Sequence, residues 1–134
     1  MGAEWFEEGA SGKTMKSAFK AAHERALWEY GHRGYTGSLA EKPGFIDMTK
    51  DFPKYSTIEE MEEILGKIAS FPNIEDYNTV SKYDYKNKKI IKRAMTEEEK
   101  TLVKIAEAAN DKWGPAVGIK IGDGEYVFFG WASS

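Results

Sequence analysis

The C-terminal stretch AVGIKIGDGEYVFFGWA, residues 116–132, constrains the fold of this chain more than any other feature. Asp123-Gly124 near its centre tolerates the positive φ angles of a tight turn, so the stretch predicts a β-hairpin. The first strand alternates apolar and other residues over 117–121, as in a strand with one buried face. The second is apolar on both faces over 126–129, which is typical of a central strand covered by helices.

Three other stretches carry apolar residues at three- and four-residue steps, which predicts three helices. The first begins near Thr14 and ends before Gly31, where we expect a left-handed C-cap. The second and third begin with the capping-box spacings of residues 56–59 (STIE) and 96–99 (TEEE). The expected apolar faces are Met15, Phe19, Ala22, Ala26 and Tyr30; Ile58, Met61, Leu65 and Ile68, with Phe71-Pro72 closing that helix; and Leu102, Ile105, Ala106, Ala109 and Trp113.

Short strands are expected at residues 4–10, 45–48 and 89–92, whereas residues 73–94 otherwise show no helical period. The chain contains no repeat and no linker, and its 134 residues are enough for one core. The sequence therefore predicts an α+β fold with a single compact domain over residues 1–134. Its small, mainly antiparallel sheet is expected to combine the N-terminal strand, the strand after residue 44 and the C-terminal hairpin, packed against about three helices.

The chain has no cysteine and two histidines, which excludes disulfides, thiolate metal sites and a cysteine nucleophile. A His-rich metal site is not expected either, and we predict no metal and no cofactor. No stretch approaches the roughly 20 apolar residues that span a bilayer, and the acidic N-terminus does not resemble a secretory signal. We therefore expect a cytoplasmic protein without a membrane partner.

The SGKT stretch at residues 11–14 suggests a phosphate-binding loop, but the full motif requires a glycine where this chain has Glu7. Thr14 as a helix N-cap explains the same residues. Binding of an anion at that helix N-terminus stays open. His23, in the middle of the first helix, belongs to no metal-binding spacing and is expected to be structural or solvated.

A glycine-rich loop, residues 30–45 (YGHRGYTGSLAEKPGF), is the strongest candidate for a binding site. His32 follows a helix C-terminus, which favours its protonated form, and Arg33 stands beside it. The glycines allow the backbone to approach a ligand, and the hydroxyl side chains can donate hydrogen bonds, so the loop suits a phosphate. The expected ligand-binding residues here are His32, Arg33, Gly34, Tyr35, Thr36, Gly37, Ser38 and Lys42. The alternative is a turn whose glycines serve geometry alone.

Glu41 has the chemistry of a general base and Lys42 that of its electrostatic partner, but neighbours on an extended segment point to opposite faces. No complete catalytic set is recovered, and no catalytic residue is assigned. Trp131, at the end of the last strand, either packs in the core or lines a pocket in which a planar ligand stacks. We favour the pocket, because Gly130 precedes the tryptophan and serines follow it.

Residues 82–93 (KYDYKNKKIIKR) alternate basic residues with Tyr83 and Tyr85, as a surface that grips single-stranded nucleic acid would. A solvated hairpin or strand explains the same pattern. The formal charge of −3 argues against a surface built throughout for phosphates, so we do not expect nucleic acid as the main partner.

Three motifs together resemble an uncharacterised family of small phage and bacterial proteins. They are GHxGYTGxxAEK from Gly31 to Lys42, WGPA from Trp113 to Ala116, and FFGWAS from Phe128 to Ser133. The resemblance covers both ends of the chain, whereas the middle, from about residue 51 to residue 95, resembles no known protein. It implies a small soluble protein carried by a phage or another mobile element.

These observations favour a non-enzymatic protein that binds a phosphate-bearing, nucleotide-like small molecule, such as a phage counter-defence protein that sequesters a nucleotide signal. One alternative is a small nucleotide-processing enzyme that uses His32 or Glu41 as its acid-base group. Another is a module that binds a host protein or nucleic acid through residues 83–93. Assembly into a homo-oligomer stays open.

Overall fold

A computed structural model of the chain describes residues 2–31, 34–70, 79–84, 86–94 and 96–134. The elements, in chain order, are β1 (Ala3–Ser11), α1 (Met15–Tyr30), the 3₁₀ turn η1 (Leu39–Glu41), β2 (Phe45–Asp47), α2 (Ile58–Ser70), β3 (Thr79–Asp84), β4 (Lys89–Ala94), α3 (Glu97–Ala109), β5 (Ala116–Gly122) and β6 (Glu125–Ser133).

One four-stranded sheet, in the order β1-β6-β5-β2, forms the centre of the molecule. β1, β6 and β5 are antiparallel, with Trp5 opposite Trp131 and Val117 opposite Phe129. The short strand β2 adds to β5 in parallel. This is the α+β fold predicted from the sequence: the N-terminal strand, the strand after the glycine-rich loop and the C-terminal hairpin share one mainly antiparallel sheet that packs against three helices.

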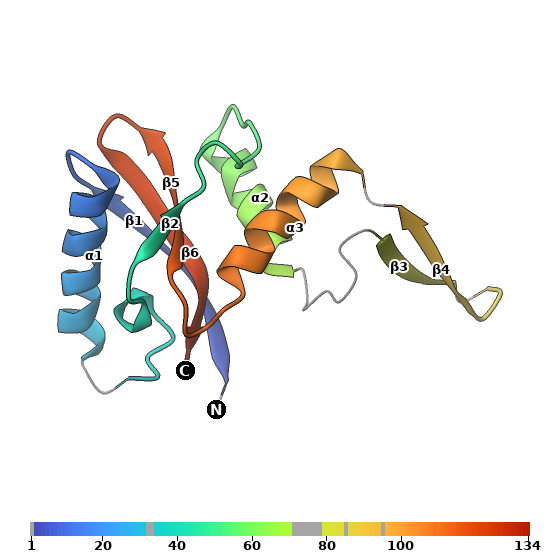
Figure 1. Cartoon of the computed structure of the whole chain (residues 1–134), viewed down its shortest axis with the longest axis horizontal. Helices are drawn as coiled ribbons and strands as arrows, with labels where there is room; N and C mark the ends of the chain where they lie inside the picture. Colours follow the sequence, from blue (N-terminus) through green and yellow to red (C-terminus); the bar gives the residue numbers. More distant parts are fainter. Residues whose placement is uncertain (1, 32–33, 71–78, 85, 95) are drawn as a thin grey trace.

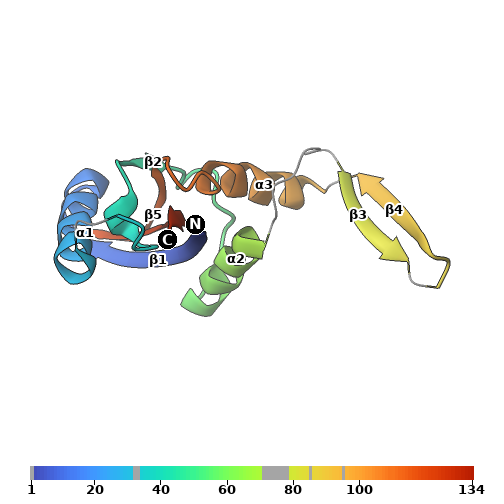
Figure 2. The same ribbon diagram turned by 90° about the horizontal axis from the view of Figure 1, so that it is seen from below.

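Helices cover both faces of the sheet (Figures 1 and 2). α1 and η1 pack on one face, in a core cluster with Tyr126 and Phe128 of β6. α2 and α3 pack on the other face, in a cluster with Val127 and Phe129. β6 is therefore buried on both sides, as its apolar sequence predicts.

β5 is also buried on both faces from Ala116 to Ile119, which corrects the expectation of a single buried face. The reason is that helices pack on both sides of it: Ala116 lies in the cluster with α1, and Val117 and Ile119 lie in the cluster with α2 and α3. Gly118 makes this possible, because a Cβ there would lie 2.9 Å from Met15 Sδ and 2.9 Å from the ring of Phe128. The glycine that occupies a non-apolar position of the alternation is thus a close-packed position.

β3 and β4 form a separate antiparallel hairpin, with Thr79 opposite Ala94 and Asp84 opposite Lys89. The hairpin projects from the body of the molecule (Figures 1 and 2). The expected strand at residues 89–92 is confirmed as part of β4. Closure of α2 by Phe71-Pro72 concerns residues outside those that the structure describes.

The helix starts follow the capping chemistry read from the sequence. Thr14 caps α1 in a capping box with Ser17, and Thr96 caps α3 in a capping box with Glu99. At α2 the expected box is one residue out of register. The hydroxyl of Thr57, not Ser56, accepts the Glu60 N–H at 3.2 Å, and the Glu60 carboxylate accepts the Ser56 N–H at 2.9 Å. The adjacent Ser and Thr made both registers compatible with the spacing.

The ends of the predicted apolar faces are exposed. Tyr30, Ile58 and Trp113 retain 52%, 51% and 58% of their surface, because the first two occupy the outermost helical positions. α3 ends at Ala109, and Trp113 lies in the following turn. There the backbone N–H of Trp113 donates to Asp111 Oδ1. Gly31 has φ 88° and ψ 179°, so its ψ is extended rather than left-handed, although its N–H still closes α1 onto the Leu27 carbonyl.

Candidate functional site

The carboxylate of Glu41 accepts hydrogen bonds from the described part of the glycine-rich loop and holds its backbone. One carboxylate oxygen accepts the Tyr35 N–H at 3.0 Å, and the other accepts the Thr36 hydroxyl at 2.7 Å and the Thr36 N–H at 3.4 Å. Ser38 Oγ lies 2.7 Å from Thr36 Oγ1 and accepts the Ala40 N–H at the start of η1. Thr36, Ser38 and Glu41 therefore satisfy one another, and their first role is to hold the loop.

The loop backbone is held in a conformation that few side chains adopt. Tyr35 has φ 57°, in the left-handed region, between Gly34 (φ 81°) and Gly37 (φ 66°). A Cβ at Gly37 would lie 2.5 Å from Glu4 Oε2, so the Glu4 side chain would have to move, and the Gly37 N–H donates to the Ser133 carbonyl at 2.8 Å. A non-glycine residue in this region costs of order 1–3 kcal/mol and persists only where its surroundings enforce it.

The strained backbone presents the ring of Tyr35 to solvent against the ring of Trp113. Their centroids are 5.9 Å apart at 85°, an edge-to-face pair, and the residues are 46% and 58% exposed. Lys112 Nζ lies 5.5 Å from the Trp113 ring centroid. The contact between these two exposed rings, beside the Lys112 cation, thus brings together the glycine-rich loop and the WGPA motif, which lie about eighty residues apart in the chain.

Lys42 is buried, at 1% exposure, and faces away from the loop surface. Its Nζ donates to the Asp111 carbonyl at 3.0 Å and to the Trp131 carbonyl. Burial lowers the pKa of Lys42 from 10.5 to about 8, and the nearby Asp111 carboxylate opposes part of that shift. Lys42 therefore ties the loop to the end of β6 and to the turn after α3, and it shares no partner with Glu41.

Trp131 is partly buried, and its indole packs on Trp5, with centroids 5.6 Å apart at 66°. Trp5 in turn packs against Phe129 and the cluster under α2 and α3. Alternate residues of a strand point to opposite faces, so the Trp131 indole shares the face of Phe129, whereas Leu39 of η1 packs on the α1 face. The structure brings the Trp131 carbonyl, and not its indole, to the loop.

The remaining sequence candidates are placed as follows. His32 and Arg33 lie outside the residues that the structure describes. His23 is partly buried and its ring stacks on Phe19 with centroids 5.5 Å apart, which agrees with a structural role. The Thr14 side chain is engaged in its helix cap, as the simpler interpretation of SGKT predicts.

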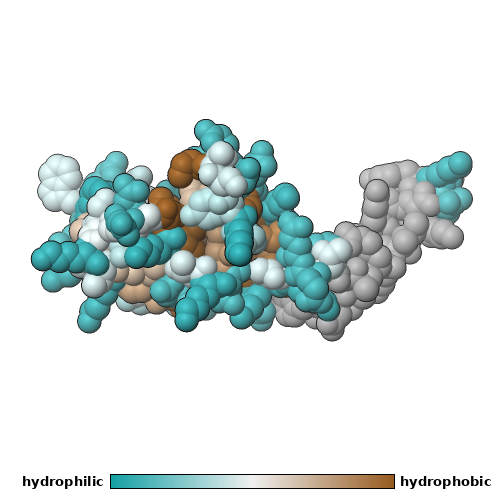
Figure 3. Space-filling model, turned by 90° about the horizontal axis from the view of Figure 1, so that it is seen from above, coloured by the Kyte–Doolittle hydropathy of each residue, from teal (hydrophilic) through white to brown (hydrophobic). Residues whose placement is uncertain are grey.

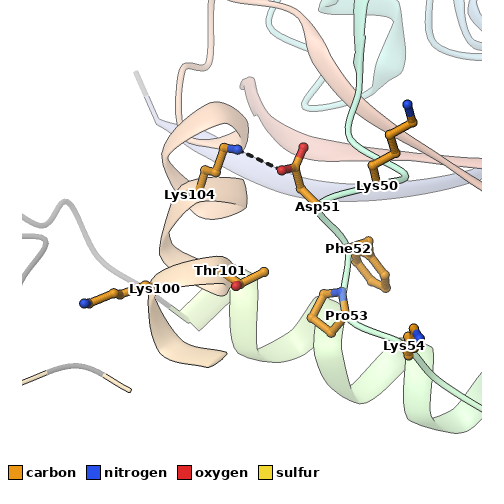
Figure 4. Close-up of a pocket in the computed structure, with 8 residues that line it drawn as sticks. All are labelled: Lys50, Asp51, Phe52, Pro53, Lys54, Lys100, Thr101 and Lys104. Carbon is orange, nitrogen blue, oxygen red and sulfur yellow. Dashed lines mark hydrogen bonds and ion pairs between the residues drawn. The ribbon is translucent and has the colours of Figure 1, made fainter. Parts of the chain in front are cut away.

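A hollow lined by lysines, about 490 Å³ in volume, was not anticipated from the sequence. It lies between residues 50–54 and α3 (Figure 4). Lys50 and Lys54 come from the first segment and Lys100 and Lys104 from the second. Among the described residues that line it, Asp51 is the only carboxylate, and it pairs with Lys104 at 2.8 Å. The other lining residues are Phe52, Pro53 and Thr101. The sequence shows the four-residue spacing within each lysine pair. It does not show that the two segments lie side by side in the fold.

The described residues contain no group of three or more His, Cys, Asp or Glu side chains arranged to hold a metal ion. None of the helices in the described parts of the chain combines the length and apolar character needed to cross a membrane. Comparison with family models, with curated proteins and with solved structures found no match to this chain.

Proposed function

We propose that the protein is a non-enzymatic binding protein for a planar, phosphate-bearing small molecule, held on the glycine-rich loop at Tyr35 and Trp113. The edge-to-face pair of these two rings, exposed on a strained loop, is the observation that carries the proposal. Aromatic rings at a protein surface stack on nucleobases, a contact worth about 1–3 kcal/mol per base. Lys112, beside Trp113, supplies a positive charge for a phosphate.

The hydrogen bonds of Glu41 favour binding over catalysis. A general base needs a free lone pair directed at the substrate proton. Three of the roughly four acceptor positions of the Glu41 carboxylate already accept hydrogen bonds from Tyr35 and Thr36 within its own loop. Its position supports a role in holding Tyr35 in the strained conformation. Sequestration of a nucleotide signal, as in phage counter-defence, would be one biological use of such a binding protein.

Two-dimensional ¹⁵N NMR of the four tryptophan indole N–H groups tests the proposal. Nucleoside monophosphates and cyclic dinucleotides serve as probes, with the unphosphorylated nucleosides for comparison. We expect the Trp113 signal to shift, more strongly with the phosphorylated probes, and Tyr35→Ala to weaken binding about tenfold. Trp28, which is 90% exposed on α1, is the matched control, and its signal should stay in place.

Equal shifts of the Trp28 and Trp113 signals, or none with any probe, would contradict the proposal. Native mass spectrometry of protein purified from cells provides a second measurement, by detecting a small molecule that copurifies. Heat denaturation of that complex should release the molecule chemically unchanged. Recovery of a converted product, abolished by Glu41→Gln, would support the enzymatic alternative instead.

A further inference from the structure

We propose that the lysine-lined hollow between residues 50–54 and α3 is a second binding site, for a small polyphosphate anion. This inference goes beyond the proposed function and shares no residue with the Tyr35–Trp113 site. Four lysines against one aspartate leave the lining with a formal charge of +3, on a chain whose formal charge is −3. The positive charge is concentrated locally against the balance of the whole molecule.

The lysines differ in how far they are already neutralised. Lys104 pairs with Asp51 at 2.8 Å, and Lys100 pairs with Glu97 at 3.4 Å and extends away from residues 50–54 in Figure 4. Lys50 and Lys54 are exposed and lie at the two ends of their segment, with no ion pair to the described residues. The proposal therefore rests on Lys50 and Lys54, whereas Lys104 of α3 is directed at Asp51 (Figure 4).

Hydrogen bonds hold the turn of residues 48–52, which carries Lys50. The Met48 N–H donates to the Gly118 carbonyl of β5 at 3.0 Å, and the Lys120 N–H donates to Thr49 Oγ1 at 3.0 Å. The N–H groups of Asp51 and Phe52 both donate to the Met48 carbonyl, which closes a turn. A backbone held in this way around Lys50 lowers the entropic cost of binding at that residue, because the side chain is the main part left to order.

A second hollow of about 310 Å³ adjoins the first and shares Phe52, Pro53 and Lys54 with it. Its lining adds Tyr55, Ile119 and a further lysine, Lys120. Apolar surface is visible between the hydrophilic side chains in the middle of the body in Figure 3. Phosphates suit the first hollow, and the apolar wall of the second suits an uncharged group attached to them.

The surroundings favour a small anion over a nucleic acid chain. The first turn of α3 carries Glu97, Glu98 and Glu99, and the first turn of α2 carries Glu59 and Glu60. These carboxylates lie on the first turns of the two helices and would repel a polyanion that extended beyond the hollow. A compact anion of two or three phosphates is short enough to stay beside the lysines of the hollow and away from these carboxylates.

Isothermal titration calorimetry of the full chain with inorganic triphosphate at low salt tests this site without any base or sugar. We expect Lys50→Gln/Lys54→Gln to weaken binding about tenfold or more, because each lysine supplies a charge-assisted hydrogen bond. The matched control Lys20→Gln/Lys88→Gln removes the same charge from exposed positions on α1 and in the turn between β3 and β4, and should change the affinity less than about twofold. Asp51→Asn should tighten binding, whereas Asp123→Asn, with the same change in net charge, should not.

An absence of triphosphate binding, or equal losses in the two double lysine variants, would overturn the proposal. A twelve-nucleotide oligothymidylate forms the second arm. If it binds more tightly than triphosphate and loses affinity in Lys50→Gln/Lys54→Gln, the hollow belongs to a nucleic-acid surface and the proposal is wrong. Since Trp113 takes no part in these measurements, their failure would leave the proposed function unaffected.

Discussion

The carboxylate of Glu41 accepts the backbone N–H of Tyr35 at 3.0 Å while Tyr35 occupies the left-handed region at φ 57°. The hydrogen bond and the strain belong together, because a tyrosine without such a partner would relax to negative φ. The exposed pair of Tyr35 and Trp113 thus depends on a residue that lies beneath the loop.

Replacing Glu41 should destabilise the protein. Glu41→Gln exchanges one acceptor oxygen for a donor that faces donors, and we expect the free energy of unfolding to fall by about 1.5–3 kcal/mol. Chemical denaturation measures the change, and hydrogen exchange at Tyr35 and Thr36 should accelerate. Glu62→Gln, on the exposed face of α2, is the control and should change stability by less than about 0.5 kcal/mol. Equal effects of the two substitutions would contradict the role of Glu41.

Because Tyr35 is held at positive φ, we expect the glycine variant at this position to be more stable than the alanine variant, whereas alanine is usually the more stabilising of the two. Tyr35→Ala and Tyr35→Gly both remove the ring, but only glycine adopts positive φ without steric cost. We expect the glycine variant to be the more stable by about 1 kcal/mol, measured by thermal unfolding. An alanine variant as stable as the glycine variant would show that Tyr35 is not held at positive φ.

Lys42 predicts a specific dependence of stability on pH. Its pKa is about 8 in the folded protein against 10.5 ordinarily, so between these values the unfolded chain binds more protons. The free energy of unfolding therefore carries the full burial penalty below pH 8 and rises as pH increases from 8 to 10.5, by up to about 3 kcal/mol. Denaturation of the wild type and of Lys42→Met across this range measures the rise. It should be missing in the variant, and parallel pH profiles would refute the assignment.

Two strand glycines should respond oppositely to the same substitution. A methyl group at Gly118 would approach Met15 and Phe128 to 2.9 Å, whereas one at Gly9 would meet nothing within 4 Å. Gly118→Ala should therefore destabilise by about 1–3 kcal/mol through overpacking. Gly9→Ala should be neutral or slightly stabilising, because it lowers the entropy of the unfolded chain. Similar melting temperatures for the two variants would mean that β5 is not packed closely on both faces.

The contact between Trp5 and Trp131 is measurable by a double-mutant cycle. Their rings lie 5.6 Å apart across β1 and β6. The single and double alanine variants should give a coupling energy of about 0.5–1.5 kcal/mol, the range of aromatic pairs. Trp131→Ala should leave the triphosphate and nucleotide affinities unchanged, because its indole does not reach the loop. A loss of nucleotide binding in Trp131→Ala would instead show that Trp131 contributes to the binding site.

Much of the fold was predictable because its determinants are local. Thr14 with Ser17 and Thr96 with Glu99 act within four residues, so the sequence alone places these helix starts. Asp123-Gly124 likewise determines the hairpin turn between β5 and β6. The same locality explains the error at α2, where Ser56 and Thr57 offer the same capping chemistry one residue apart.

The sequence by itself determined the three helices, the C-terminal hairpin and the apolar strand that must be covered on both faces, since helical and strand periods are written within a few residues. Only the tertiary structure decided the sites. Lys42 meets carbonyls 69 and 89 residues further along the chain. Trp113 lies beyond the end of α3, where its ring contacts Tyr35. Residues 50–54 lie beside α3 and form the lysine-lined hollow with it. Such contacts follow from the packing of whole helices and strands, a sum over many distant residues that no short pattern contains.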